Sequence, residues 1–396
     1  MIENKCTKCH APLGHFNAHH NGLDYTIAEM ENDPVALDGV SCTLCHQIKE
    51  ESLGNYSGNI EVGENKLIWG PFENPFPNSM IVQTGYTPTH SNHIKDSKLC
   101  GSCHTLLTPT VDLQGNLTGT EFVEQAIYHE WLNSDFSQNN TTCQSCHVPE
   151  IDDPVQIGSM PPWIEPRSPF GMHHLAGANV FMLKILKNNV ETLGLTADPI
   201  HFDSTIARAE RMLQTATVFM EVNEVVRTAD TLFVDVMLQN MAGHKFPTGF
   251  PSRRAFIELE VVDQSGSTLF HSGAMDDDFQ LLNEDETYEP HHNSITQNEQ
   301  VQIYEMVMGD VEQNPTTVLL YASEALKDNR LPPAGFVSSH YAYDTVGVFG
   351  QALQDVDFNQ LNGVEGSGMD VVHYAIPVNG NAGSLQLVVK LHYQTI

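Results

Sequence analysis

The chain is 396 residues long, which exceeds the usual size of a single domain, so two or three structural units are expected. Its formal charge of -32, from 18 Lys and Arg against 50 Asp and Glu, disfavours nucleic acid or an anionic membrane surface as a partner. Only 17% of the residues are charged, so the composition does not indicate disorder. The nearest approach to a continuous apolar run, residues 180–186, is far shorter than the roughly 18 to 20 residues of a membrane span.

Four Cys-x-x-Cys-His motifs occupy residues 6–147 and use all eight cysteines of the chain. In such a motif, two thiols three residues apart bond to the vinyl groups of one porphyrin, and the adjacent His is thereby placed to bind the iron. Chance would give roughly 0.01 such motifs in a chain of this composition. We therefore expect four covalently attached haems c. Their thiols and proximal iron ligands are Cys6, Cys9 and His10; Cys42, Cys45 and His46; Cys100, Cys103 and His104; and Cys143, Cys146 and His147.

Zinc and disulfide bonds are the alternatives for these cysteine pairs. Paired Cys-x-x-Cys units also form zinc ribbons, and exported proteins often contain disulfides. Zinc does not require a His after every second Cys with no Cys left over.

Covalent haem is attached outside the cytoplasmic membrane, and the residues before Cys6 leave no room for a signal peptide. We therefore expect an exported protein, periplasmic, extracellular or on the cell surface, whose signal peptide is missing from this sequence.

The hydrophobic pattern changes twice after the haem motifs. Residues 178–193 and 204–217 have apolar side chains at helical spacing and predict two bridging helices, the second after an Asp203–Ser204 cap. From about Thr217 apolar and polar residues alternate, which predicts strands at 218–222, 232–236, 256–261, 267–270 and 385–393. We expect an α+β protein with a loop-rich, haem-packed tetrahaem domain at 1–170, a short helical bridge at 171–216 and an antiparallel β-sandwich-like domain at 217–396.

Two acidic clusters lie within the predicted β-domain, at Asp276–Asp278 and Glu284–Glu286. Carboxylate oxygens are the ligands that calcium prefers, so these clusters are candidate calcium ligands. They lack the ordered loop pattern of a known calcium site, and a solvated loop is the default interpretation.

Each haem also needs a sixth iron ligand or an open position, and sixteen of the 20 histidines lie outside the motifs. This abundance favours bis-histidine ligation, which gives low-spin iron and lower potentials than His/Met ligation. The sequence alone leaves open which histidines bind. The candidates are His19 and His20 in a loop after the first motif, His90 and His93 before the third, His173 and His174 at the start of the bridging helix, His244 in a Gly- and Pro-bounded loop between two strands, and His291 and His292 in a further loop.

Several stretches make the chain resemble a family of exported multihaem cytochromes found in metal-reducing and related anaerobic microbes. They are 38–47, 97–105, Glu130–Ser134, 174–182, the GHKFPTGFPSRR stretch at 243–254, Glu289–His291 and 327–331, so the resemblance spans most of the chain. It implies that the distal haem ligands are His93, His174, His244 and His291, with His20 next and with His19, His90 and His173 as alternates.

The layout is also similar to that of extracellular tetrahaem and hexahaem cytochromes that polymerise into conductive filaments, or nanowires. In those proteins the haems stack continuously, and a distal His can come from the next subunit. The resemblance implies a homopolymer with haem stacking across subunits.

The predicted function is electron transfer rather than enzyme catalysis, either by a diffusing carrier or by the subunit of a filament. One alternative is a multihaem oxidoreductase with one five-coordinate haem that acts on nitrogen or sulfur compounds. A third interpretation is a structural module whose β-domain binds a partner. Enzyme activity needs an open iron position, and its usual sign, a Lys in place of the motif His, is absent from all four motifs. The expected partners are redox proteins or extracellular electron acceptors.

Overall fold

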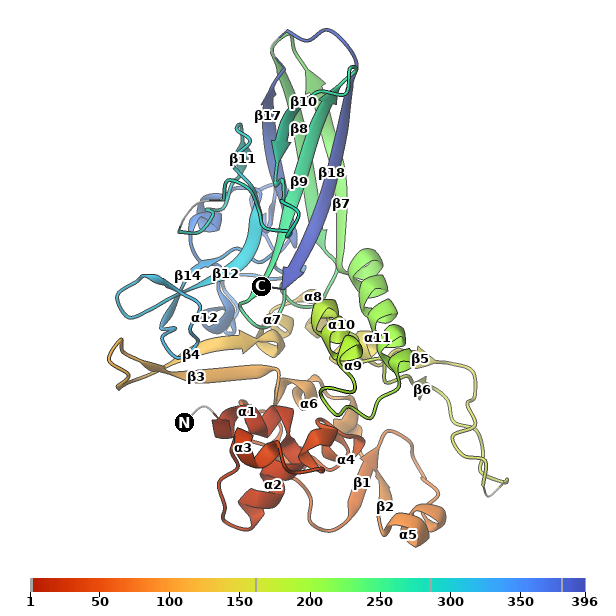
Figure 1. The fold of residues 1–396 in the computed structure, drawn as a ribbon. Helices are drawn as coiled ribbons and strands as arrows, with labels where there is room; N and C mark the ends of the chain where they lie inside the picture. The colour runs from red at the N-terminus through yellow and green to blue at the C-terminus, as the bar shows by residue number, and fades with distance from the viewer. Residues whose placement is uncertain (1–2, 161, 285–286, 379, 396) are drawn as a thin grey trace. The chain divides into compact units, whose positions relative to one another are not determined.

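The computed structural model describes residues 3–160, 162–284, 287–378 and 380–395 (Figure 1). The chain divides into two compact units, the first made of residues 1–107 and 141–175 and the second of residues 108–140 and 176–396. This division differs from the predicted boundaries at residues 170 and 216. Residues 108–140 belong to the second unit because they bond to it, as the Thr110 hydroxyl does to the Ala322 carbonyl at 2.7 Å. The two bridging helices also belong to the second unit.

The first unit consists of short helices and two small sheets joined by long loops. In one sheet β1 and β2 pair in parallel, and in the other β5 and β6 pair antiparallel. Among the described residues, the helices are α1 (Glu3–His10), α2 (Pro12–His20), α3 (Ile27–Met30), α4 (Cys42–Cys45), α5 (Asn78–Thr84), α6 (Ser97–Gly101) and α9 (Cys143–His147), and the strands are β1 (Leu67–Gly70), β2 (Thr87–His90), β5 (Glu150–Ile151) and β6 (Phe170–Gly171).

Helix α2 corrects the prediction of a flexible loop after the first haem motif. Pro12 stands at the first helical position, where its fixed φ angle and its missing N–H are tolerated. The helix continues to His20 and ends before Gly22, which has a positive φ of 71°. His19 and His20 therefore lie in the last turn of a helix, and not in a loop.

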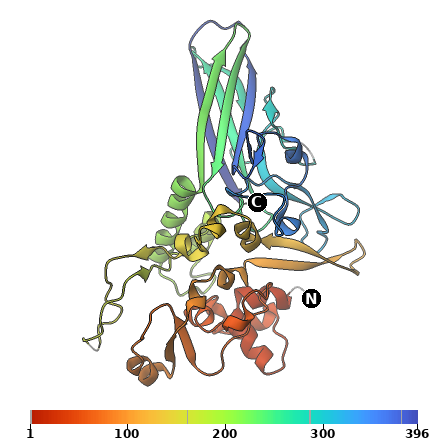
Figure 2. The same cartoon turned by 180° about the vertical axis from the view of Figure 1, so that it is seen from behind.

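The two predicted bridging helices are present in the second unit and pack side by side, as Figures 1 and 2 show. The first is α10 (Val180–Asn188), whose Asn179 cap accepts a hydrogen bond from the Met182 N–H. The second, α11 (Pro199–Met212), begins earlier than predicted. Asp198 caps it in place of Asp203 because Pro199 fits the first helical position. Shorter helices are α7 (Ile127–Leu132), α8 (Asp135–Gln138) and α12 (Tyr343–Val346).

Two sheets make up most of the second unit, and each of the five predicted strands overlaps a strand of one of them. The first sheet has the order β11-β17-β8-β7, and the second is built on β9, which pairs with β10, β12 and β18. The strands are β3 (Thr105–Val111), β4 (Leu117–Ala126), β7 (Val218–Arg227), β8 (Thr231–Asn240), β9 (Arg253–Asp263), β10 (Thr268–Ser272), β11 (Ser294–Ile295), β12 (Ile303–Gly309), β13 (Pro315–Thr316), β14 (Glu324–Asp328), β15 (Gln360–Leu361), β16 (Val364–Glu365), β17 (Met369–Pro377) and β18 (Leu385–Thr395).

The main hydrophobic core lies in the second unit, between these two sheets. Alternate residues of β8 point into it, including Val234 and Val236, and they meet Ile257 and Leu259 from β9. This alternation is the period-two pattern that the sequence shows for a strand with one buried face. Mixed helices and sheets make the chain an α+β protein. Within the described residues, no helix combines the length and apolar character needed to cross a membrane.

Candidate functional site

All four Cys-x-x-Cys-His motifs lie in the first unit, and each forms a single helical turn. Residues three apart in a helix lie on the same face, so the two thiols of each motif point to the same side. In the third motif the turn extends beyond α6, because the His104 N–H donates to the Cys100 carbonyl at 2.9 Å. Local backbone geometry therefore presents each thiol pair as attachment to one porphyrin requires.

A loop at residues 57–59 joins the first motif to the third. The Gly58 N–H donates to the Ser102 carbonyl at 2.9 Å, and the Lys8 ammonium donates to the Asn59 side chain at 2.7 Å. Gly58 has a φ of 68°, and a Cβ there would lie 3.0 Å from the Cys9 sulfur. Glycine is therefore needed at 58 both for the backbone conformation and for the close approach to the thiol.

The third motif also contacts the second and the fourth. The Cys143 N–H donates to the Ser97 hydroxyl at 3.1 Å, and the Gln144 side chain donates to the Ile94 and Asp96 carbonyls. Leu44 of the second motif is buried in a small cluster that includes Leu99 next to the third. The third motif is thus the centre of the group.

Thiols from different motifs lie close enough to shift one another's pKa. The pairs are Cys9 with Cys103, and Cys100 with Cys143. The neighbouring Cys143, together with burial, raises the pKa of Cys100, whereas the neighbouring Cys100 lowers the pKa of Cys143 to about 7. Burial raises the pKa of Cys45, and this thiol is close enough to Cys100 and Cys103 to affect both electrostatically. None of the eight cysteines, all of which are described, forms a disulfide.

The ring of His46 is oriented by the backbone of Trp69. Its Nδ1 lies 2.5 Å from the carbonyl oxygen of Trp69, and its own carbonyl accepts a hydrogen bond from the Trp69 N–H at 2.8 Å. A carbonyl can only accept, so Nδ1 carries the proton and Nε2 keeps its lone pair. Ligating histidines in proteins commonly donate their second N–H in this way. The second motif therefore fits a haem, with Cys42 and Cys45 as attachment points and His46 as iron ligand.

The tandem pair His173–His174 belongs to the same unit as the motifs. It follows β6, which pairs with β5 next to the fourth motif. The N–H of Leu175 donates to the His147 carbonyl at 2.8 Å and so holds this segment against the fourth motif. The imidazole rings of His173 and His46 have centroids 6.2 Å apart. The resemblance implies His174, with His173 as its alternate, and His173 is the member of the pair whose ring lies near that of His46.

His93 is buried, and both of its ring nitrogens already have protein partners. Nε2 lies 3.0 Å from the Ile48 carbonyl and Nδ1 lies 2.6 Å from the Ser91 hydroxyl. The carbonyl requires the proton on Nε2, the nitrogen that usually binds haem iron. The role of His93 as a distal ligand stays a prediction. Its alternate, His90, ends strand β2 and is half-buried.

The helix α2 histidines are the remaining candidates in the first unit. His20 is exposed, with Nδ1 3.3 Å from the Glu64 carboxylate. The rings of His15 and His19 stack with centroids 6.3 Å apart, one helical turn from each other. Burial lowers the pKa of His15 to about 4, and its Nδ1 meets the Thr7 hydroxyl at 3.0 Å. His15 therefore stays neutral and links α2 to α1.

His244 lies in the second unit, in the Gly243–Gly249 loop between β8 and β9. Its Nδ1 lies 3.1 Å from the Lys245 carbonyl, which places the proton on Nδ1 as at His46. This orientation agrees with the predicted role in iron ligation, which stays a prediction. The loop is anchored by Lys245, whose buried ammonium contacts Asp328 and the Gly347 carbonyl, each at 2.8 Å.

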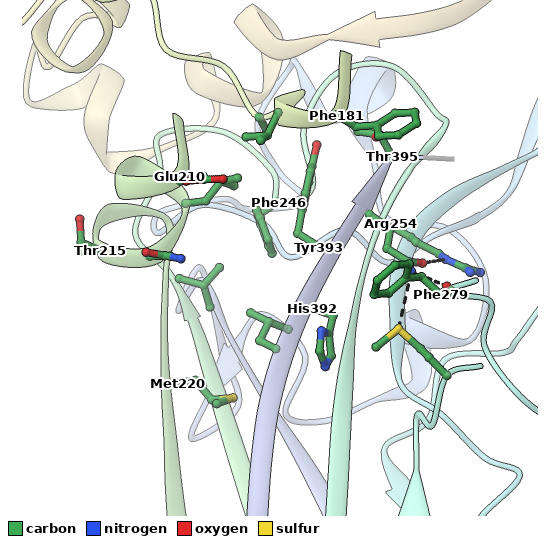
Figure 3. Close-up of a pocket in the computed structure, with 18 of the residues that line it drawn as sticks. Phe181, Glu210, Thr215, Met220, Phe246, Arg254, Phe279, His392, Tyr393 and Thr395 are labelled. Atoms are coloured by element: carbon green, nitrogen blue, oxygen red, sulfur yellow. Dashed lines mark hydrogen bonds between the residues drawn. The ribbon is translucent and has the colours of Figure 1, made fainter. Parts of the chain in front are cut away.

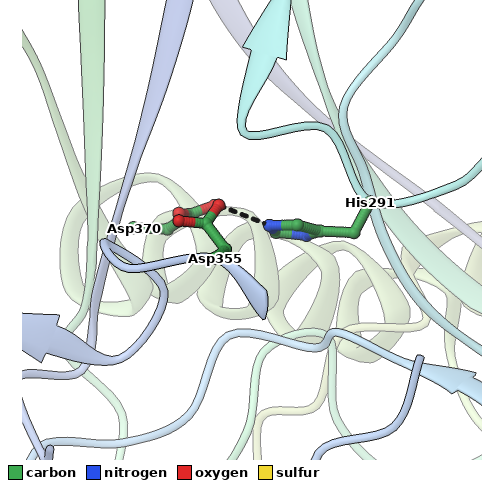
Figure 4. A group of neighbouring side chains, drawn as sticks. All are labelled: His291, Asp355 and Asp370. Carbon is green, nitrogen blue, oxygen red and sulfur yellow. Dashed lines mark hydrogen bonds and ion pairs between the residues drawn. The ribbon is translucent and has the colours of Figure 1, made fainter. Parts of the chain in front are cut away.

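His291 is fixed in a buried polar cluster with Asp355 and Asp370 (Figure 4). Its Nε2 lies 2.9 Å from Asp355, and its Nδ1 accepts from the Gln302 and Asn329 amides at 2.8 and 3.0 Å. Both amide oxygens accept backbone N–H groups, so the orientation of these amides is set. Nδ1 is thus an acceptor and Nε2 carries the proton. The role of His291 as a distal ligand stays a prediction, and one ligand atom from each of His291, Asp355 and Asp370 lies within 4.8 Å of the others.

The acidic clusters proposed for calcium are engaged in local contacts. Asp276 accepts the backbone N–H groups of Asp278 and Gln280, both at 2.9 Å, as carboxylates in tight turns do. Glu284 forms an ion pair with Arg254 at 2.8 Å. Asp285 and Glu286 lie outside the described residues. Calcium binding stays a prediction without support from the described part of these clusters.

An open cavity of about 1200 Å³ lies in the second unit among α10, α11 and strands β7, β9 and β18 (Figure 3). Its lining is largely apolar and includes Phe181, Phe246 and Phe279. Its arginine, Arg254, is held by Glu284 and by the Gln394 side chain. The lining of the cavity therefore suits the binding of an apolar group better than it suits catalysis.

Sequence reasoning missed the groups that orient the histidines. The carbonyl of Trp69, which determines the ring nitrogen of His46 that carries the proton, is a backbone group. Every residue has such a carbonyl, so the sequence gives no sign of its role. Asp355 and Asp370 lie far along the chain from His291 and belong to no motif. For the pair His173–His174, the one signal in the sequence was that two histidines stand next to each other, so that either could bind iron.

No protein-family model and no curated protein matches the sequence. Among solved structures, the fold is similar to that of a penta-heme cytochrome c552 from Thermochromatium tepidum, with a TM-score of 0.54 and 16% sequence identity. The match covers 98% of this chain and 76% of that chain. At this identity the likeness concerns the fold, and the chain shares its fold with a multihaem cytochrome.

Proposed function

We propose that this chain is an electron-transfer protein that carries four covalently attached haems c in its first unit. Each motif would hold one haem through its two thiols and bind the iron through its histidine. The attached haems would supply reversible one-electron chemistry. The chain's own residues attach the porphyrins, orient the imidazoles and determine how close the porphyrins come to one another.

The proximity of thiols from different motifs is the observation that carries this proposal. Cys9 with Cys103 and Cys100 with Cys143 link the first, third and fourth motifs, and Cys45 of the second lies near the third. A thioether bond ties a porphyrin edge to each sulfur. Neighbouring thiols therefore bring neighbouring porphyrin edges together, which is the arrangement that electron transfer from haem to haem needs. The fold likeness to a multihaem cytochrome supports the same proposal.

Haem counting tests the attachment. The chain produced with a c-type haem attachment system should contain four haems, measured by the pyridine haemochrome spectrum and by intact mass after denaturation. The double variant Cys42→Ala/Cys45→Ala should contain three. Apo protein, bound zinc or noncovalent haem would contradict the proposal.

Spectra of the native protein test whether the haems only transfer electrons. Four six-coordinate haems should give low-spin ferric signals, reversible reduction of all four haems and no carbon monoxide binding by the reduced protein. A five-coordinate haem that acts on nitrogen or sulfur compounds would instead give a high-spin signal and bind carbon monoxide. That result would turn the proposal toward a haem oxidoreductase.

Export and self-assembly are the finer parts of the proposal. The resemblance to filament cytochromes predicts homopolymers outside the cell, and the charge of -32 opposes self-association unless cations screen it. Negative-stain microscopy of concentrated protein in salt should show filaments if the chain polymerises. Monodisperse particles under those conditions would identify a diffusing carrier.

A further inference from the structure

We infer that His173 is the sixth iron ligand of the haem attached at Cys42 and Cys45, on the opposite face from His46. This inference rests on the proposed function, because it assigns a ligand to one of its four haems. It also chooses between two adjacent histidines that the sequence could not separate.

The His46 side of this site is rigid. Two backbone contacts tie the residue to Trp69 of β1, one to the ring and one to the main chain. Strand β1 is in turn paired with β2 over four residues, from Leu67 opposite Thr87 to Gly70 opposite His90. The proton on Nδ1 leaves the lone pair of Nε2 for the iron, so the ring is orientated before any metal binds.

The His173 side is held from the other direction by the segment that follows β6. The Met172 N–H donates to the Pro149 carbonyl at 2.9 Å, and the Leu175 N–H donates to the His147 carbonyl at 2.8 Å. These bonds bracket the His173–His174 pair and fix its backbone. The side chain of His173 is exposed, whereas that of His174 is half-buried.

The separation of the two rings matches an axial pair. An imidazole–metal bond is about 2 Å long and the ring centre lies about 1 Å beyond the nitrogen, so two imidazoles on opposite faces of one iron have centroids about 6 Å apart. The His46 and His173 centroids are 6.2 Å apart, and their planes are 39° from parallel. Axial imidazoles can differ in plane, since each ring rotates about its own bond to the metal. Adjacent residues cannot both occupy this position, and the geometry selects His173.

The variant His173→Ala tests the assignment, with His174→Ala as its matched control. In a protein with four haems, His173→Ala should make one haem in four high-spin by ferric paramagnetic resonance and should let one haem in four bind carbon monoxide when reduced. Added imidazole should restore the low-spin signal by replacing the missing ring. His174→Ala should leave all four haems low-spin.

A second pair of variants identifies which haem is affected. In the Cys42→Ala/Cys45→Ala background, which lacks the haem of the second motif, adding His173→Ala should produce no further high-spin signal. A new high-spin haem in that background would show that His173 ligates a different iron and would overturn the assignment. Four low-spin haems in His173→Ala, or a high-spin haem in His174→Ala, would overturn it as well. A chain without covalent haem would instead refute the proposed function.

Discussion

Asp370 is a fully buried carboxyl group whose surroundings oppose ionisation. Burial raises its pKa above the usual 3.8, and the nearby charge of Asp355 acts in the same direction. His291 lowers the pKa of Asp370, and so does the Tyr304 hydroxyl, which donates a hydrogen bond to the Asp370 carboxylate at 2.6 Å. Tyr304 and Tyr374 both belong to the main hydrophobic core. Asp355 lies 2.9 Å from His291 Nε2 and accepts its hydrogen bond. A carboxyl group in a dry site is more stable in its neutral form than in its ionised form.

The stability of the protein should therefore fall as pH rises through the raised pKa of Asp370. Between pH 3.8, the unfolded value, and that raised pKa, the folded state binds more protons than the unfolded state, so the free energy of unfolding decreases with pH. For one proton the slope is at most about 1.4 kcal/mol per pH unit. Asp370→Asn should remove this slope, because the amide carries no titrating proton. Denaturant unfolding measured from pH 4.5 to 8 checks the expectation.

Asp277→Asn is the matched control for this prediction. Asp277 is exposed, so its replacement should leave the pH dependence as it is in the parent protein. Equal slopes for the parent chain and Asp370→Asn would mean that Asp370 is ionised throughout this pH range.

The loop between β8 and β9 depends on a buried ionic network. Lys245 is fully buried and pairs with Asp328 at 2.8 Å, while Arg330 contacts Asp328 at 2.7 Å and Glu130 at 2.9 Å. The Glu130 carboxylate also accepts the Lys245 backbone N–H at 3.0 Å. Two positive and two negative charges thus neutralise one another away from water and hold His244 at the start of the loop. Burial and the nearby charge of Arg330 lower the pKa of Lys245, whereas Asp328 and Glu130 act in the opposite direction, so its charge depends on these two carboxylates.

Removing one member of this network should be costly. Lys245→Met leaves Asp328 with one cation and the Gly347 carbonyl without its donor, so the free energy of unfolding should fall by about 3–5 kcal/mol. Lys184→Met is the control, because it breaks an ion pair between two side chains, Lys184 and Glu210, that are each about half exposed. It should change the free energy of unfolding by less than about 0.5 kcal/mol. Denaturant unfolding of the full chain compares the two. Equal effects would show that Arg330 alone neutralises Asp328.

At the scale of the whole molecule, the excess of acidic residues should determine how the proposed electron-transfer protein meets charged reactants. The formal charge is -32, and the propionates of attached haems would add to it. Charged reactants are steered by the summed field of the protein, and salt screens that field over a Debye length of about 8 Å at physiological ionic strength. Cationic electron acceptors should be favoured over anionic ones.

Rates of electron transfer to small complexes measure this field. Oxidation of the reduced protein by hexaammineruthenium(III), a cation, should slow by about tenfold or more when sodium chloride is raised from low millimolar to 0.2 M. Oxidation by ferricyanide, an anion, should accelerate over the same range. Identical salt dependence for both acceptors would indicate that the acidic residues lie away from the haem edges that exchange electrons.

The sequence by itself determined the features that depend on neighbouring residues. The Cys-x-x-Cys-His motifs are local, because one helical turn brings both thiols to the same face. The helices at 180–188 and 199–212 and the strands from Val218 onward were also readable, because apolar periodicity reports one buried face. The α2 helix was missed because its histidines obscure the apolar pattern that Pro12 begins.

The tertiary structure alone decided which distant residues meet. Residue 46 is positioned by β1, and residue 173 is positioned by the segment after β6. No motif or fixed separation along the sequence indicates that these two residues lie near each other. The same holds for His291, whose Nδ1 accepts hydrogen bonds from Gln302 and Asn329, and for residues 108–140, which join the second unit. A histidine's proton is placed by whichever groups pack against its two nitrogens, and packing between distant segments is a property of the folded chain.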